Sequence, residues 1–395
     1  MPVSRYWIWG LFAVLGMAAI TALLIWKEPA LPADHYKSAM RAVETGNQMA
    51  LRRELDWFRR TSGTEGYRSL LAGVLLLRDG NPTAALDELQ HAVHDPATRV
   101  DAWTFAAEAY YKLGHLAEAG EVARSALADD PRSHRARRWL ASAYYDLGAI
   151  SPVTEELRIL SREVPEDGRP DRLLALIAKD NEQYREAVDH YRESLRRDAR
   201  AMDRFQMLIE LAECQLKLQD HEGCLNSLAD VPMSAARLAL QAEAQEGLGR
   251  HTEARASVEQ ALELDPHHVP SLIFQATLLL TTGDPAMAAR VLERALELQP
   301  HSATARFKLS QAYRQLGEPE RAAEQSRLME ESRKLEREFV DRHHEAASDV
   351  TNAELRFRLG QLARQLGKPE LARMWFRAAV SLDPNHASAR QALNE

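Results

Sequence analysis

Small, apolar and turn-forming residues recur along the chain at a fixed spacing from Pro32 onward. The spacing is 34 residues at first and becomes irregular later in the chain. The units start at Pro32, Gly66, Val100, His134, Gly168, Phe205, Ala235, Val269, Ala303 and Ala353. A repeat of this length is typical of helical hairpins that stack on their neighbours. The pattern therefore predicts an all-α array in which each unit supplies two helices, A and B.

Three positions within the unit explain how such a hairpin would form. The eighth position is small in every unit, and the twentieth is small in most, so helices A and B can cross closely there. The fifteenth position is glycine in eight of the ten units, which suits the left-handed conformation that ends a helix. Those glycines are Gly46, Gly80, Gly114, Gly148, Gly249, Gly283, Gly317 and Gly367. Proline at the thirty-second position of several units then stops helix B.

One unit shows the consensus of a known family almost position for position. Its residues are Trp103, Ala107, Tyr110, Gly114, Ala119, Ala126 and Pro131. This pattern resembles the tetratricopeptide repeat family, and the likeness extends over nearly all of the chain after residue 32. The resemblance implies a right-handed α-solenoid of about nine to ten hairpins, with a concave face lined by the A helices that receives an extended peptide. It does not imply a reaction.

The departures from the pattern define the expected organisation of the array. We expect repeats over 34–346, with a degenerate first unit as a cap, an irregular unit near 205–234 and an extended helix over 319–346. A final unit and a capping helix are expected over 353–395. Leu328, Leu335 and Phe339 share one face of the extended helix. That face either packs under the final unit or forms a contact with a second copy or another partner.

The N-terminal segment is different in character. Residues 6–26 contain no charged side chain, and a helix of that length spans about 31 Å, which is close to the hydrocarbon core of a bilayer. Tyr6, Trp7, Trp9 and Trp26 lie near its ends, as interfacial aromatic residues do. We predict a transmembrane signal-anchor between a short tail (1–5) and a linker (27–33), and a single-pass protein of the cell (inner) membrane with extracytoplasmic repeats. The alternative is a cleaved signal peptide.

Composition and motifs narrow the function class. The net charge of −8 argues against a nucleic-acid-binding protein, which would need a positive surface. Phosphate-binding, zinc-protease and serine-hydrolase motifs are missing, so we predict no enzyme activity, no cofactor and no metal site. The two cysteines, Cys214 and Cys224, either pair in an oxidising compartment or are small apolar side chains inside one hairpin.

The resemblance also assigns candidate groove residues, because five positions of helix A face the concave side in this family. Basic and aromatic residues occupy these positions in the middle of the chain, and a set of Phe, Gln and Arg recurs in the units at Ala303 and Ala353. The candidates are Tyr111, Arg135, Arg138, Tyr145, Arg169, Arg172, Lys179, Phe307, Gln311, Arg314, Phe357, Gln361 and Arg364. Such a groove suits an extended segment that carries carboxylates and apolar side chains.

The sequence therefore predicts a membrane-tethered scaffold that holds extended protein segments in an envelope assembly or quality-control complex. The alternative is an accessory or regulatory subunit of an enzyme encoded elsewhere. Protein segments are the expected partners, nucleic acid is not, and the long helix over 319–346 is a possible surface for oligomerisation.

Overall fold

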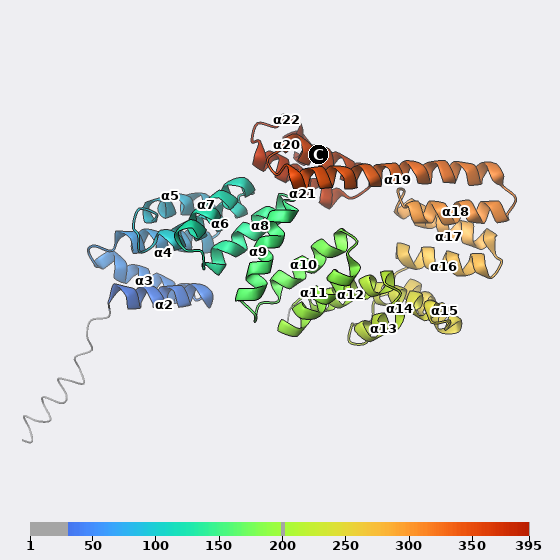
Figure 1. The fold of residues 1–395 in the computed structure, drawn as a ribbon, viewed down its shortest axis with the longest axis horizontal. Coiled ribbons are helices and arrows are strands. Elements are labelled where there is room, and N and C mark those ends of the chain that lie inside the picture. The colour runs from blue at the N-terminus through green and yellow to red at the C-terminus, as the bar shows by residue number, and fades with distance from the viewer. Residues whose placement is uncertain (1–30, 199–201, 395) are drawn as a thin grey trace, which may run out of the picture. The chain divides into compact units, whose positions relative to one another are not determined.

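The computed structural model describes residues 31–198 and 202–394. These residues form 21 α-helices, numbered α2 to α22, and no strand (Figure 1). The all-α prediction is confirmed.

The helices form successive hairpins along the chain. Their bounds are α2 Pro32–Glu44, α3 Gln48–Arg60, α4 Glu65–Arg78, α5 Pro82–Ala92, α6 Arg99–Lys112, α7 Leu116–Asp129, α8 His134–Asp146, α9 Ile150–Glu163, α10 Arg169–Asp180, α11 Tyr184–Arg197, α12 Arg204–Lys217, α13 His221–Leu228, α14 Ala235–Gly247, α15 His251–Leu264, α16 Val269–Thr281, α17 Pro285–Leu298, α18 Ala303–Gln315, α19 Pro319–Ser348, α20 Ala353–Gln365, α21 Pro369–Leu382 and α22 Ala387–Asn394.

The turn inside each hairpin has the backbone conformation expected from the fifteenth position. All eight glycines there have positive φ angles, between 68° and 84°. The two units without glycine do the same, since Glu182 and Gln219 have φ angles of 58° and 60°. Non-glycine residues adopt this conformation only at a cost in free energy, so the hairpin imposes the turn even where the sequence does not favour it.

Side chains at the starts of many helices also account for where those helices begin. Ser133 accepts a hydrogen bond from the backbone N–H of Ala136, and Ser302 accepts one from Ala305. Asn352 does the same for Leu355. Each satisfies a backbone N–H that the first helical turn leaves without an intrahelical partner.

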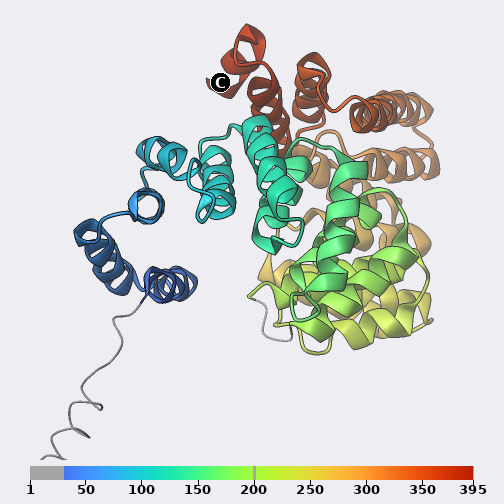
Figure 2. The same cartoon turned by 60° about the vertical axis from the view of Figure 1, so that its left-hand side comes forward.

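The chain divides into two compact units, one ending at Ala109 and the other beginning at Tyr110. In the first, Leu70, Leu71 and Val74 of α4 are fully buried, as are Phe58 of α3 and Leu89 of α5. The second holds the remaining repeats, and successive hairpins pack on one another within it (Figure 2).

The irregular unit near 205–234 has a short second helix, as its sequence predicts. Helix α13 contains only 8 residues and ends at Leu228, before Pro232. Cys214 and Cys224 are both free and fully buried in one apolar cluster with Met207 and Leu228. Burial raises the pKa of the Cys214 thiol to about 11 and that of Cys224 to about 12. The structure therefore agrees with small apolar side chains rather than a disulfide.

The extended helix predicted over 319–346 is α19, which contains 30 residues. Phe339 packs against a cluster that includes Ala346 and Trp375, so this end of the helix lies on the final repeat. Leu328 and Leu335 are half-buried. A contact between two copies through α19 stays a prediction.

The predicted location as a single-pass membrane protein is wrong by this structure. Within residues 31–198 and 202–394, no helix is both long enough and apolar enough to cross a bilayer. Helix α19 has the length, but charged side chains run along it. Residues 6–26, with the aromatic side chains of Tyr6, Trp7, Trp9 and Trp26, lie outside the described residues.

Candidate functional site

Two of the cationic groove residues predicted from the A helices form ion pairs with residues at or in the next A helix. Arg172 of α10 contacts Asp203, the residue before α12, and Lys179 of the same helix contacts Glu213 of α12. Both cations and their partners are partly buried. These pairs join one repeat to the next, so the two side chains contribute less free positive charge than the sequence suggested.

Two other predicted groove residues share one carboxylate. The Nε of Arg138 lies 3.2 Å from Asp167, and Arg169 donates two hydrogen bonds of 2.8 Å to the same side chain. Burial alone would raise the pKa of Asp167, but the hydrogen bonds from Arg169 and the charges of both arginines outweigh it and hold the pKa below its ordinary value.

These arginines surround a cavity of about 340 Å³. Arg135, Arg138 and Arg169 contribute to its wall together with apolar side chains of Trp139 and Leu173. The structure therefore brings three of the predicted groove residues to one hollow, which arginine and apolar side chains line together with Asp167.

Two predicted aromatic residues of the same face, Tyr111 and Tyr145, lie close to acidic side chains. The hydroxyl of Tyr111 donates to Asp146 at 2.7 Å, and its ring lies 5.3 Å from that of Trp139. Burial raises the pKa of Tyr111 well above its ordinary value, and the hydrogen bond to Asp146 adds to this shift. Burial likewise raises the pKa of Tyr145, and the nearby charge of Asp180 adds to the shift.

The recurring set in the last two full repeats does not occupy equivalent surroundings. Phe307 is 37% exposed on α18. Phe357, its counterpart on α20, packs 5.6 Å from Phe376 and 4.9 Å from His386. Gln311 and Gln361 are both half-buried.

The two arginines of this set also differ. Arg314 donates to the hydroxyl of Ser310 at 3.0 Å. Arg364 lies over the ring of Phe376, 5.7 Å from its centre. The assignment of all these residues to a ligand surface stays a prediction.

The C-terminal repeat makes a contact that the sequence pattern does not predict. Helix α21 packs against α7 and α8, more than 200 residues earlier in the chain (Figures 1 and 2). Leu116 of α7 and Leu147 join a buried cluster with Leu359, Trp375 and Phe376 of the last repeat. We call this the closure contact, because it joins the last repeat of the second unit to its first helices.

Arg356 lies at the centre of the closure contact and is fully buried. Its guanidinium donates to the carbonyl of Leu147 at 3.1 and 3.2 Å and to that of Ala346 at 2.8 Å, and it also contacts the carbonyl of Asp349. These carbonyls belong to the C-terminal ends of α8 and α19, where the helix dipole favours a positive charge. Burial lowers the pKa of Arg356 to about 10, so the side chain stays charged at neutral pH.

Two further contacts complete the closure. Gly148, in the turn after α8, lies against the Trp375 indole so closely that a Cβ atom there would come within 2.4 Å of it. The hydroxyl of Ser381 accepts a hydrogen bond from the backbone N–H of Ala117 at 3.0 Å. Ser381 thus acts as a cap for α7, whose own preceding residue, His115, provides no side-chain cap.

A second cavity lies beside the closure contact and measures about 880 Å³. One wall comes from α8, α10 and the turns that follow them, and the other comes from α19, α21 and the turn before α21. Of the predicted groove residues, Tyr145 lines this cavity. We call it the closure cavity.

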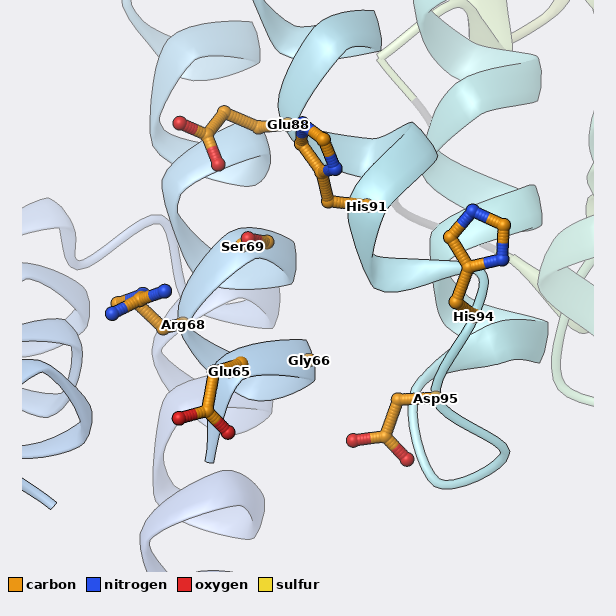
Figure 3. Close-up of a pocket in the computed structure, with 8 residues that line it drawn as sticks. All are labelled: Glu65, Gly66, Arg68, Ser69, Glu88, His91, His94 and Asp95. Carbon is orange, nitrogen blue, oxygen red and sulfur yellow. The ribbon is translucent and has the colours of Figure 1, made fainter. Parts of the chain in front are cut away.

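The first unit has an open depression of about 780 Å³ between α4 and the end of α5. Figure 3 shows Glu65 on one side of it, and His91, His94 and Asp95 on the other. Both histidines are exposed, and among the described residues no group of His, Cys, Asp and Glu is placed to hold a metal ion. This depression therefore gives no support for a metal site.

Comparison with known families agrees with the repeat geometry. One tetratricopeptide repeat family matches residues 70–134, 106–151 and 275–329, and a second matches 236–268 and 353–386. The matched ranges together cover just over half of the chain. The chain is a tetratricopeptide repeat protein. Repeats of this kind generally mediate contacts between proteins, and neither matched family indicates an enzyme.

Comparison with solved structures finds matches at low sequence identity. A tetratricopeptide repeat protein from Parabacteroides merdae is 16% identical, with 63% of this chain and 99% of that one covered and a TM-score of 0.42. The pilF protein of Pseudomonas aeruginosa is 20% identical, with coverages of 54% and 97% and a TM-score of 0.44. The Cut9–Hcn1 structure is 13% identical, with coverages of 98% and 88% and a TM-score of 0.40. No match to a curated protein sequence is found.

Proposed function

We propose that this tetratricopeptide repeat protein is a non-catalytic scaffold that binds an extended segment of a partner protein on the A helices of its second unit. The observation that carries the proposal is the cavity at α8 and α10, where predicted groove residues from two repeats meet. Its arginine and apolar side chains suit a segment that presents both carbonyl or carboxylate oxygens and apolar side chains.

The contacts of Arg138 and Arg169 with Asp167 determine which of their N–H groups are left for a partner. Arg138 and Arg169 are held in place by Asp167, so they are positioned before any partner arrives. A guanidinium group has five N–H donors, and Asp167 does not use them all. Backbone carbonyls of an extended segment can accept hydrogen bonds from the remaining N–H groups, which gives affinity without a strict sequence requirement.

A display library of random twelve-residue peptides, selected on the full chain, tests this proposal. We expect peptides to be enriched, and we expect the double substitution Arg138→Gln and Arg169→Gln to weaken their binding at least tenfold, which corresponds to about 1.4 kcal/mol. Neutral glutamine is preferred to a reversed charge because glutamate would be repelled by Asp167 and could perturb folding.

The matched control is Arg158→Gln on α9, an exposed arginine whose guanidinium lies 3.6 Å from Glu186 of the next repeat. Binding to this variant should equal that of the unmodified chain. Equal binding to the double variant would exclude the α8–α10 cavity as the binding surface, and failure to enrich any peptide would contradict the proposed function itself.

A further inference from the structure

The closure cavity has two walls that the chain brings together only through the closure contact. Ile177 of α10 and Tyr145 of α8 belong to one wall, and Phe339, Val340 and Met374 belong to the other. The cavity is therefore complete only while the C-terminal repeat lies on α7 and α8.

The apolar part of the cavity comes mostly from α19 and α21. Val340 is half exposed, at 50%, although it is a large aliphatic side chain on a helix otherwise rich in charge. Phe339 and Met374 beside it are only partly buried. A side chain of leucine or phenylalanine size inserted here would remove these three surfaces from water, which is favourable.

The ionisable side chains that line the cavity are two carboxylates, one lysine and the two histidines His343 and His344. Asp180 and Glu182 bring two carboxylates, and Lys368 brings one ammonium group. Neither carboxylate forms an ion pair within 4 Å in the part of the chain that the structure describes. Asp180 and Glu182 are also exposed, so both remain accessible to a cation from outside.

One buried donor in the cavity wall lacks a partner. Trp375 is 2% exposed, and its indole N–H has no hydrogen-bond acceptor among the described residues. This nitrogen is itself buried from solvent, so the apolar face of the Trp375 ring, and not its N–H group, is what Trp375 offers to the cavity.

We infer that the closure cavity is a binding site for a partner segment in which a large apolar residue lies next to a lysine or arginine. This inference rests on the proposed function and assigns a partner class to a second site on the same unit. The apolar side chain fills the space beside Val340 and Met374, and the basic residue pairs with Asp180 and Glu182.

The closure cavity differs in charge from the α8–α10 cavity, so the two cavities should select different peptides. The α8–α10 cavity is lined by three arginines and one carboxylate, whereas the closure cavity is lined by two carboxylates and one lysine. A partner segment that bound in both cavities would present carboxylate or carbonyl oxygens to the α8–α10 cavity and a basic side chain to the closure cavity.

The same twelve-residue peptide library on the full chain tests the inference. We expect enriched peptides to include a class with a large apolar residue adjacent to lysine or arginine. Binding of that class should fall at least tenfold in Val340→Arg, which fills the cavity and adds a cation, and at least fivefold in the double variant Asp180→Asn and Glu182→Gln.

The matched control for Val340→Arg is Leu264→Arg, because Leu264 is also an exposed aliphatic side chain, at 57%, and lies on α15 away from the cavity. Circular dichroism shows whether both variants keep their helices. If peptide binding is lost in the Arg138→Gln and Arg169→Gln variant but unchanged in Val340→Arg, the inference is wrong and the proposed function stands. If no peptide is enriched, both are wrong.

Discussion

Two arginines at the same position of neighbouring full repeats have very different roles. Arg306 of α18 and Arg356 of α20 are each the fourth residue of their unit. Arg306 donates to the carbonyl of Pro300, six residues before it, and to Gln325. Arg356 is fully buried and joins the end of α8 to the end of α19.

The local bond of Arg306 recurs along the chain. Four further arginines each donate to the carbonyl six residues before them: Arg99 to Val93, Arg137 to Pro131, Arg237 to Val231 and Arg390 to Pro384. Such a contact ties the start of one helix to the end of the preceding one, so it is local to neighbouring elements. Arg356 makes the closure contact instead, so an arginine at a repeated position forms a contact that differs from the local bond of Arg306.

The largest expected effect comes from removing that single contact. Arg356→Met should destabilise the second unit by about 3 kcal/mol, because it leaves buried carbonyls without a donor. Arg306→Met should cost about 1 kcal/mol, since its carbonyl partner is more exposed. Hydrogen exchange measured by mass spectrometry is the suitable readout, because repeat proteins unfold by parts.

The two variants should differ in where hydrogen exchange increases as well as in how much it increases. Arg356→Met should increase exchange in α20 and α21 and also in α7 and α8. Arg306→Met should affect only α17 to α19. If both variants raised exchange in their own repeats alone, the closure contact would not contribute to the stability of α7 and α8.

The second prediction compares two glycines with the same backbone conformation. Gly148 has a φ of 69° and lies against Trp375, whereas Gly249 has a φ of 74° and no atom within 4 Å of the place where a Cβ would be. Gly249→Ala should therefore cost about 1 kcal/mol from backbone strain alone. Gly148→Ala should cost about 1–3 kcal/mol more, because Trp375 is buried and must move.

Thermal unfolding followed by circular dichroism measures both substitutions. The difference between them isolates the packing of Trp375 on the turn, since the backbone term is common to the two. Equal losses would mean that Trp375 can shift without cost and that the closure contact is loosely packed.

The third prediction concerns capping by a distant residue. Ser381→Ala removes the acceptor for the Ala117 N–H, and Ser133→Ala removes the local cap of α8. Each should cost about 1 kcal/mol. Ser381→Ala should also raise hydrogen exchange in the first turn of α7, which is 264 residues away in sequence, while Ser133→Ala should affect α8 alone. Unchanged exchange in α7 would show that Ser381 is not its cap.

The sequence predicts the repeated part of this molecule well, because equivalent positions pack in the same way in each repeat. The fifteenth position predicted the left-handed turns, and the eighth predicted buried small residues such as Ala107, Ala141 and Ala212. The short α13 and the long α19 were also expected from irregular spacing.

The closure contact could not be predicted in the same way. Arg356, Trp375 and Ser381 interact with residues more than 200 positions away, and no spacing in the sequence specifies that distance. The groove cations show the same limit. Their positions were assigned from the repeat pattern, but the partners Asp203, just before α12, and Glu213, within α12, became evident only in the structure.

The smallest expected effect concerns the ion pairs of the α8–α10 cavity, which resemble the local contacts rather than the closure. The Asp167 side chain is 8% exposed and its folded-state pKa is lowered. A lowered pKa contributes stability that is present above the unfolded value of about 3.9 and is lost as the pH falls through the folded value. Asp167→Asn should therefore destabilise the second unit at pH 7 by about 1 kcal/mol, a modest amount because the arginines are partly exposed and screened by solvent.

The pH profile of urea unfolding provides the decisive measurement for Asp167→Asn. The difference between the variant and the unmodified chain should shrink as the pH falls from 5 towards 2, because the unmodified carboxylate becomes protonated and loses both arginines. Asp189→Asn, at an exposed position on α11, should show no such convergence. A difference that stays constant with pH would mean that Asp167 acts through neutral hydrogen bonds, and that its charge does not position Arg138 and Arg169 for a partner.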